Sequence, residues 1–152
     1  GLWVTFSLAA GLSAITSRPV AMDLLAYAGA VIWLVGFLIE SVADLQKGRF
    51  RSNSANKGRF IASGLWSWSR HPNYFGEIVL WFGIAIMAFP VLQGWQYATL
   101  VSPFFVILLL TRVSGIPLLE DAADKKWGGQ ADYERYKAAT SVLIPLPPRL
   151  KD

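Results

Sequence analysis

The chain has 152 residues, of which 54% are hydrophobic and 14% aromatic, while only 16% are charged and the formal net charge is +4. An average soluble domain carries about 25% charged residues, and the apolar residues here form long blocks. This composition excludes a disordered chain and an ordinary soluble enzyme, and the lack of cysteine in the sequence excludes a disulfide scaffold. We therefore expect a membrane protein.

Four apolar stretches are predicted to be membrane helices, because a lone apolar strand in lipid would leave its backbone groups unpaired. They cover residues 1–15, 20–39, 74–92 and 97–110. About 20 residues are needed to cross a bilayer, so the first stretch is short, and we expect a clipped helix in the C-terminal portion of a larger protein. Several small residues in the second stretch suit close helix–helix packing: Ala28, Gly29, Ala30 and Gly36.

Charge placement predicts how these helices are oriented. Six basic residues lie in segment 42–72, between the second and third stretches, and more follow in the tail 112–152, whereas the connection 93–96 carries no charge. Basic segments next to membrane helices stay on the cytoplasmic side. We therefore predict one membrane domain over residues 1–152, whose basic loop at 42–72 and tail at 112–152 face the cytoplasm.

The tail differs from the rest of the chain because it is polar and charged. It is predicted to form two short helices over residues 118–139, separated by Gly128 and Gly129, with Asp132 as the N-cap of the second. The prolines that follow end regular structure. We expect a helical lid on the cytoplasmic face, with its aromatic side chains near the lipid headgroups: Trp127, Tyr133 and Tyr136.

The densest group of functional residue types is the sequence GLWSWSRHPNYFGE at 64–77, which joins the basic loop to the third stretch. Pro72 suits a helix start, and the free amides beside Asn73 form a helix N-terminus that suits a phosphate group. Glu77 lies about one turn inside the apolar stretch, on the same face as Asn73. A carboxylate at membrane depth costs about 2.5–3.5 kcal/mol, so Glu77 is expected to face the bundle and a partner.

Arg70 and His71 in this motif have two interpretations. They are candidate ligand-binding residues, or they merely mark the membrane boundary, with Glu77 paired to one of them for structural reasons. His71 is the only histidine of a sequence without cysteine. It is therefore a poor candidate for a metal ligand, and we expect no metal site.

A second group of charges lies at the cytoplasmic end of the second stretch. Glu40 and Asp44 are four residues apart and share a helix face, although two acids near a helix C-terminus oppose its dipole. We expect them to serve a ligand's donors or to pair with arginine. Arg51 is a candidate phosphate contact, the alternative being a basic loop that contacts anionic lipid. The sequence contains no nucleic-acid-binding, Rossmann or P-loop motif, so we expect no nucleic-acid partner.

Residues 64–77, followed by Trp81 and Gly83, resemble the C-terminal domain of the steroid 5-alpha-reductase family, and most closely its bacterial branch. The resemblance extends over residues 40–145. The Arg-His-Pro-Asn-Tyr block alone is less specific, because it recurs in sterol reductases and, as Arg-His-Pro-x-Tyr, in isoprenylcysteine methyltransferases. Positions outside the block also match: Asp44, Lys47, Arg51, residues 114–117, Glu120, Tyr133, Tyr136, Ile144 and Pro145.

This resemblance implies an all-α, polytopic transmembrane helix bundle that uses NADPH to reduce a carbon–carbon double bond conjugated to a ketone. Its substrate would be a steroid or another lipid-like enone, and its cofactor would bind on the cytoplasmic side. The family's acid–tyrosine pair, which polarises the ketone, would come from helices upstream, so we assign no catalytic residue within this span. The implied cofactor-binding positions are Glu40 (asparagine in animal relatives), Asp44, Arg51, Arg70, His71, Asn73, Tyr74, Glu77 and Glu120.

We expect a monomer in the bacterial cytoplasmic membrane, or in the endoplasmic reticulum membrane if the protein is eukaryotic. The main alternative is a membrane methyltransferase that uses S-adenosylmethionine on isoprenylcysteine or phospholipid and shares the Arg-His-Pro-x-Tyr block. Those enzymes favour a Glu-Glu pair after the last span, where this chain has Glu120 and Asp121. A third alternative is a non-catalytic membrane scaffold that binds neither nucleotide.

Overall fold

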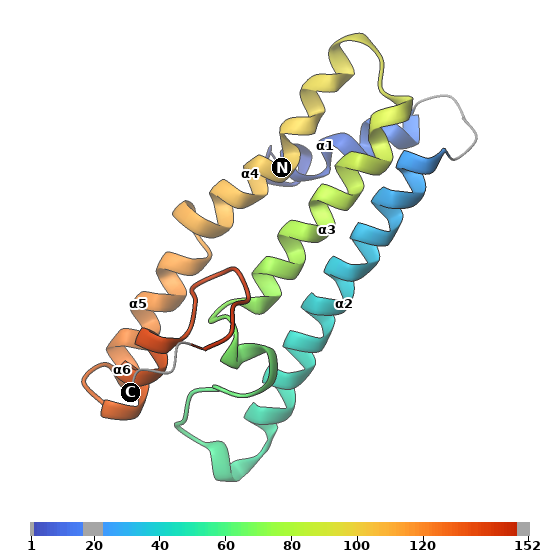
Figure 1. Cartoon of the computed structure of the whole chain (residues 1–152). Helices are drawn as coiled ribbons and strands as arrows, with labels where there is room; N and C mark the ends of the chain where they lie inside the picture. The colour runs from blue at the N-terminus through green and yellow to red at the C-terminus, as the bar shows by residue number, and fades with distance from the viewer. Residues whose placement is uncertain (1, 17–22, 149–152) are drawn as a thin grey trace.

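The computed structural model describes residues 2–16 and 23–148 of the protein, and over these residues it is built from helices (Figure 1). An isolated bridge between Ser69 and Ser141 is the only strand-like pairing among them. The predicted all-helical fold is therefore confirmed. In chain order the elements are α1 (Leu2–Thr16), α2 (Leu24–Ser52), η1 (Ser54–Asn56), η2 (Gly64–Ser67), α3 (Pro72–Ala88), η3 (Phe89–Val91), η4 (Gly94–Val101), α4 (Ser102–Leu108), η5 (Leu109–Val113), α5 (Ile116–Trp127) and α6 (Ala131–Ala139).

The helices form an elongated bundle. α2 and α3 lie antiparallel and side by side, and the segment from η4 to α5 forms a third long column (Figure 1). α1 packs near one end of the bundle, against α3, η4 and α4. Three helical segments are long and apolar enough to cross a membrane: Leu24–Ser52, Pro72–Val91 and Gly94–Trp127. They confirm an integral membrane protein and the last three predicted stretches, whereas α1 is helical but has only 15 residues.

α2 and α3 approach each other so closely that only glycine fits at their contact. A Cβ on Gly36 would lie 2.4 Å from a backbone nitrogen of α3, and a Cβ on Gly76 would lie 2.5 Å from a backbone nitrogen of α2. Helices in lipid associate through small residues of this kind, because lipid tails supply no hydrophobic force between them. The predicted packing role is confirmed for Gly29 and Gly36, whereas Ala28 is exposed.

α2 is longer than the sequence suggested. It continues past residue 39 to Ser52, so the start of segment 42–72 is helical where a loop was expected. The added turns are rich in good helix formers such as leucine, lysine and arginine. They are also held by tertiary packing, because Ala43 is buried and its carbonyl accepts a hydrogen bond from the Trp66 indole at 3.0 Å. Apolar content alone therefore underestimates the length of this helix.

The polar tail folds into α5 and α6 after a break in the third column. The break consists of one π-helical segment, η5, followed by Ser114 and Gly115. Gly128 and Gly129 separate α5 from α6, as predicted. The predicted N-cap of α6 is wrong: the cap is Gln130, and Asp132 lies in the first turn, where its carboxylate still complements the helix dipole.

Candidate functional site

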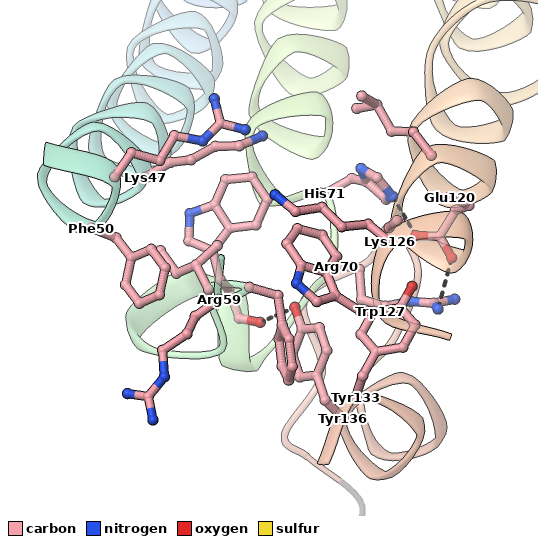
Figure 2. Close-up of a pocket in the computed structure, with 17 residues that line it drawn as sticks. Lys47, Phe50, Arg59, Arg70, His71, Glu120, Lys126, Trp127, Tyr133 and Tyr136 are labelled. Atoms are coloured by element: carbon pink, nitrogen blue, oxygen red, sulfur yellow. Dashed lines mark hydrogen bonds and ion pairs between the residues drawn. The ribbon is translucent and has the colours of Figure 1, made fainter. Parts of the chain in front are cut away.

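A pocket of about 310 Å³ lies where the end of α2, the segment 59–71, α5 and α6 meet (Figure 2). Its walls include the rings of Trp66 and Trp127, each with a lysine Nζ 4.6 Å from the ring centre. Among the residues that the structure describes, Glu120 is the only acid in the lining. Such a pocket suits an anionic ligand. The basic residues in the lining are Lys47, Arg51, Arg59, Arg70 and Lys126.

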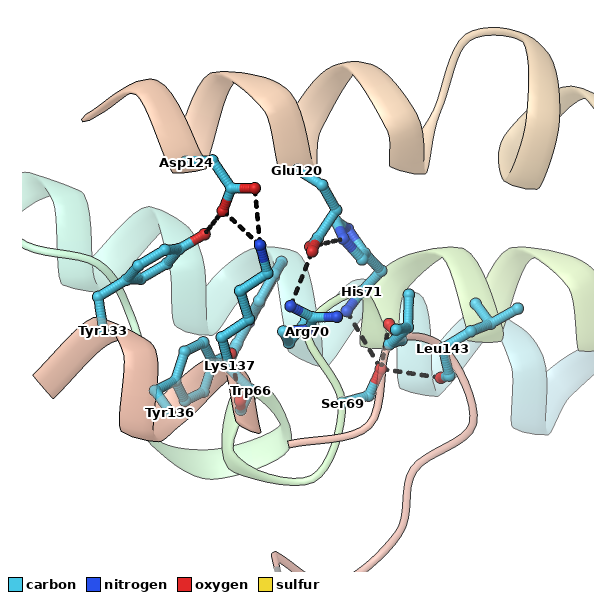
Figure 3. A network of polar contacts seen from close by, with 11 residues as sticks. Trp66, Ser69, Arg70, His71, Glu120, Asp124, Tyr133, Tyr136, Lys137 and Leu143 are labelled. Atoms are coloured by element: carbon cyan, nitrogen blue, oxygen red, sulfur yellow. Dashed lines mark hydrogen bonds and ion pairs between the residues drawn. The ribbon is translucent and has the colours of Figure 1, made fainter. Parts of the chain in front are cut away.

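Glu120 on α5 connects the pocket wall to the 64–77 motif. Its Oε2 lies 2.7 Å from Arg70 Nη1, and its Oε1 lies 2.8 Å from His71 Nε2 (Figure 3). The Arg70 and His71 side chains are only 11% and 6% exposed, so these ion-pair contacts are shielded from water. The alternative that Glu77 pairs with one of these two residues is therefore wrong, since their carboxylate partner comes from α5, 49 residues after His71.

Three acidic side chains form a second group between α2 and α3. The close contact at Gly76 brings the two helices together at Glu40, and Glu40, Asp44 and Glu77 interact electrostatically. The Tyr74 ring stacks on His71 with ring centres 5.7 Å apart, which links this acidic group to the pocket. Across residues 2–16 and 23–148, no set of three or more acidic or histidine side chains is placed to hold a metal ion.

The predicted cofactor positions thus fall into two adjoining groups. Trp66 and Lys126 line the pocket as well, and sequence reasoning did not assign them to the site, although Trp66 is part of the 64–77 motif. Lys126 gave no comparable signal, because it resembles any exposed lysine of a charged helix. Of the predicted residues, Arg51, Arg70, His71 and Glu120 line the pocket, and Glu40, Asp44, Asn73, Tyr74 and Glu77 lie outside its lining on α2 and α3.

Phe60 is the centre of an aromatic cluster that holds α6 and the end of α5 against the pocket. Its ring centre lies 5.9 Å from that of Trp127 and 5.3 Å from those of Tyr133 and Tyr136. The Trp127 indole also donates a hydrogen bond to the Gly58 carbonyl at 2.6 Å. These aromatic side chains were expected near lipid headgroups. They pack against the Phe60 ring and line the pocket, and their position relative to the headgroups stays a prediction.

Two tyrosine hydroxyls in this cluster have fixed acceptors. Tyr136 donates to the Trp66 carbonyl at 2.7 Å, and Tyr133 donates at 2.8 Å to Asp124, which also pairs with Lys137 at 2.6 Å (Figure 3). Burial raises the pKa of both hydroxyls, and the neighbouring Asp124 carboxylate raises the pKa of Tyr133 further. Both tyrosines therefore stay protonated and act as donors well into the alkaline range.

Comparison with known proteins places these features in a family. The model of a family described as "Protein of unknown function (DUF1295)" matches residues 2–140. The chain belongs to the DUF1295 family. The match includes α1 to α6 and both groups of predicted site residues.

Curated relatives of the chain include two reductases of steroids or sterols. The chain is 28% identical over 118 residues to 3-oxo-5-alpha-steroid 4-dehydrogenase 1 of Bos taurus, which is 78% of this chain and 40% of that protein. It is 30% identical over 165 residues to Delta(14)-sterol reductase of Ascobolus immersus, or 95% of this chain and 35% of that protein. The resemblance to the steroid 5-alpha-reductase family is confirmed, and its bacterial branch stays a prediction.

A methyltransferase is also among the relatives. The chain is 30% identical over 98 residues to a probable O-methyltransferase of Ustilaginoidea virens, which is 64% of this chain and 32% of that protein. The chain therefore spans less than half the length of each of these three relatives. No solved structure gives a significant match.

Proposed function

We propose that this chain forms the cofactor-binding part of an integral membrane reductase that uses NADPH to reduce the double bond of a lipid-like enone, such as a 3-oxo-Δ4-steroid. The fungal relative is named as a sterol reductase and the bovine relative as a 3-oxo-5-alpha-steroid 4-dehydrogenase, and both names support an oxidoreductase of steroid-like lipids. The observation that carries the proposal is that Arg51, Arg70, His71 and Glu120, four positions implied by the family resemblance to bind the cofactor, line one basic and aromatic pocket.

The lining residues fit a phosphorylated dinucleotide. Five basic side chains surround the pocket, and its one carboxylate, Glu120, is already paired with Arg70 and His71. Positive charge therefore remains for phosphate groups. The rings of Trp66 and Trp127 hold the ammonium groups of Lys47 and Lys126 at the pocket wall, each 4.6 Å from a ring centre. The cavity of about 310 Å³ lies at the lower end of the usual range for small-molecule sites, so we expect it to hold part of the dinucleotide.

Each group of residues has a distinct part in this proposal. When bound, NADPH supplies a hydride for the β carbon of the enone. Arg51 is assigned to phosphate, above all the 2′-phosphate, because its planar guanidinium binds phosphate oxygens in pairs. Asn73 and Glu77 are assigned to the nicotinamide amide or a ribose hydroxyl, since they lie in the first two turns of α3, whose first turn carries Tyr74 beside His71. The proton donor is expected outside this span.

Comparing two neighbouring arginines tests the proposal. With the full-length protein in detergent, NADPH or NADH oxidation is followed after addition of a steroid enone. We expect Arg51→Ala to raise KM for NADPH about tenfold and to leave KM for NADH within about twofold, because NADH lacks the 2′-phosphate. Arg49→Ala removes a charge of the same helix from outside the pocket lining and should change neither. A lack of NADPH oxidation with every enone tried would contradict the proposal.

A methyltransferase is the second candidate, because one relative is named as a probable O-methyltransferase. S-adenosylmethionine carries a positively charged sulfonium and no phosphate. The five basic side chains around the pocket therefore give it little electrostatic attraction. If the protein binds S-adenosylmethionine and not NADPH, the reductase proposal is wrong.

A further inference from the structure

Ser69 lies directly before Arg70 and His71, but it does not belong to the pocket lining. The residue is 0% exposed. Its hydroxyl accepts a hydrogen bond from the His71 backbone N–H at 3.1 Å and donates one to the Leu143 carbonyl at 2.8 Å (Figure 3). A single buried hydroxyl therefore connects the 64–77 motif to the tail segment 141–146, 74 residues further along the chain.

Backbone hydrogen bonds hold the tail segment 141–146 against the motif on both sides of Ser69. The Arg70 N–H donates to the Ser141 carbonyl at 2.8 Å, and the Leu146 N–H donates to the Trp68 carbonyl at 3.0 Å. The backbone of Arg70 and His71 is thus placed by the tail as well as by the start of α3. Because Ser69 is fully buried, water has no access to replace its hydroxyl if it is removed.

The position of this backbone matters for the pocket because the Arg70 and His71 side chains both hold Glu120. Their contacts with its two carboxylate oxygens are 2.7 Å and 2.8 Å long. A shift of the backbone at residues 69–71 would lengthen both contacts together. Glu120 would then no longer be fixed by Arg70 and His71. It could pair with other basic side chains of the pocket, which would then be less available to a ligand.

We propose that Ser69 is a positioning residue of the cofactor site: its hydroxyl ties the Arg70–His71 backbone to the tail and, through these two side chains, orients Glu120 on the pocket wall. This inference rests on the proposed function of the pocket as an NADPH site. Ser69 acts only through other residues, and it makes the tail segment 141–146 part of the site although no residue of that segment lines the pocket.

Steady-state kinetics of the full-length Ser69→Ala variant test the inference. Removing the hydroxyl leaves the buried His71 N–H without its partner and takes a donor from the half-buried Leu143 carbonyl. We therefore expect KM for NADPH to rise about tenfold while kcat at saturating NADPH stays within about twofold. A merely structural role would lower the active fraction, and with it kcat, at an unchanged KM. That result would overturn the inference.

Two further variants serve as a matched control and a conservative substitution for this test. Ser67→Ala removes a hydroxyl from the same motif that bonds only to the Gly64 carbonyl at 2.7 Å, and it should leave KM unchanged. Ser69→Cys fills the same space with a weak hydrogen-bonding group, so it should raise KM by a smaller factor even if the alanine variant does not fold. The inference is contradicted if Ser67→Ala raises KM as much as Ser69→Ala does. It is also contradicted if Ser69→Ala does not fold and Ser69→Cys leaves KM unchanged.

A mutant cycle with Glu120→Gln tests whether Ser69 acts through Glu120. In the Glu120→Gln background, Ser69→Ala should change KM for NADPH by less than about twofold. If it changes KM about tenfold there too, the two residues are independent and the inference is wrong.

A chemical measurement separates the failure of this inference from the failure of the proposed function. If the wild-type protein neither binds nor oxidises NADPH, the proposed function is wrong. The role of Ser69 is then read from the rate at which diethyl pyrocarbonate modifies His71, measured by peptide mass mapping. The His71 ring is 6% exposed and engaged by Glu120, so modification should be several-fold faster in Ser69→Ala than in Ser67→Ala. Equal rates would overturn the inference.

Discussion

The membrane part of the molecule and its polar end are each stabilised by a different kind of interaction. Between α2 and α3, glycines allow backbone to approach backbone, as at Gly36 and Gly76. At the polar end, buried side chains from distant segments hold each other through ion pairs and hydrogen bonds, as Glu120 holds Arg70 and His71. The first region depends on the absence of side chains, and the second on the identity of each side chain.

This difference determines which changes each region tolerates. A contact between helix backbones is sensitive to added volume, because the opposing helix has no side chain that can move away. A polar network is sensitive to the loss of one partner, because the remaining group stays buried without compensation. Added volume is therefore expected to do most damage in the membrane region, and loss of a single side chain to do most damage at the polar end.

The largest effect is expected from adding a side chain at the helix contact. Gly36→Leu would place its Cβ 2.4 Å from a backbone nitrogen of α3, so α2 and α3 must separate and most of the folded protein should be lost. The matched control is Gly48→Leu on the same helix, where a Cβ has nothing within 4 Å. Thermal unfolding in detergent measures both variants, and equal stability of the two would contradict the described contact.

The next largest effect is expected at the centre of the polar network. Glu120→Ala leaves Arg70 and His71 without their carboxylate, which should lower the free energy of unfolding by about 1–3 kcal/mol and weaken NADPH binding at least about tenfold. Asp121→Ala, one residue away, removes only an exposed pair with Lys125 and should change little. Calorimetric titration and thermal unfolding check both. Similar losses of stability and NADPH affinity in the two variants would show that the Glu120 contacts contribute no more than an exposed ion pair.

Glu77→Gln tests whether the acidic group between α2 and α3 belongs to the ligand site or to the fold. The side chain keeps its size and loses its charge, beside Glu40 and Asp44. We expect a clear loss of NADPH affinity, about tenfold, with nearly unchanged thermal stability. If stability and affinity fall together, Glu77 serves helix packing, and the membrane region and the ligand site are not separable at this point.

The smallest effect is expected from one hydroxyl of the aromatic cluster. Tyr136→Phe removes the hydrogen bond to the Trp66 carbonyl and should lower the free energy of unfolding by about 1 kcal/mol. Because the pKa of Tyr136 is raised in the folded protein, this tyrosine stabilises fully below pH about 10, the pKa of an unfolded tyrosine, and its contribution falls above that pH. Denaturation at pH values on both sides of 10 should show a weaker alkaline loss in Tyr136→Phe, and an identical loss would contradict this assignment.

The same difference explains how much the sequence predicted. Apolar runs and small residues are local signals, so the helices, the glycine contacts and the start of α3 at Pro72 were predictable. The partner of Arg70 and His71 was not, because Glu120 is brought to them only by the break after α4 and the packing of α5. Ser69 lies in the same motif, but its role carried no signal of its own, since its acceptor is a backbone carbonyl 74 residues away. The motif did identify Arg70 and His71, which line the pocket, because functional residue types cluster there.

The central claim is that the pocket at the polar end binds NADPH. The most direct test is a thermal shift of the full-length protein in detergent with NADPH, NADH or S-adenosylmethionine, because a ligand that binds only the folded state raises the melting temperature by mass action. We predict a clear rise with NADPH, a smaller one with NADH, and none with S-adenosylmethionine. A rise with S-adenosylmethionine alone, or with none of the three, would contradict the claim.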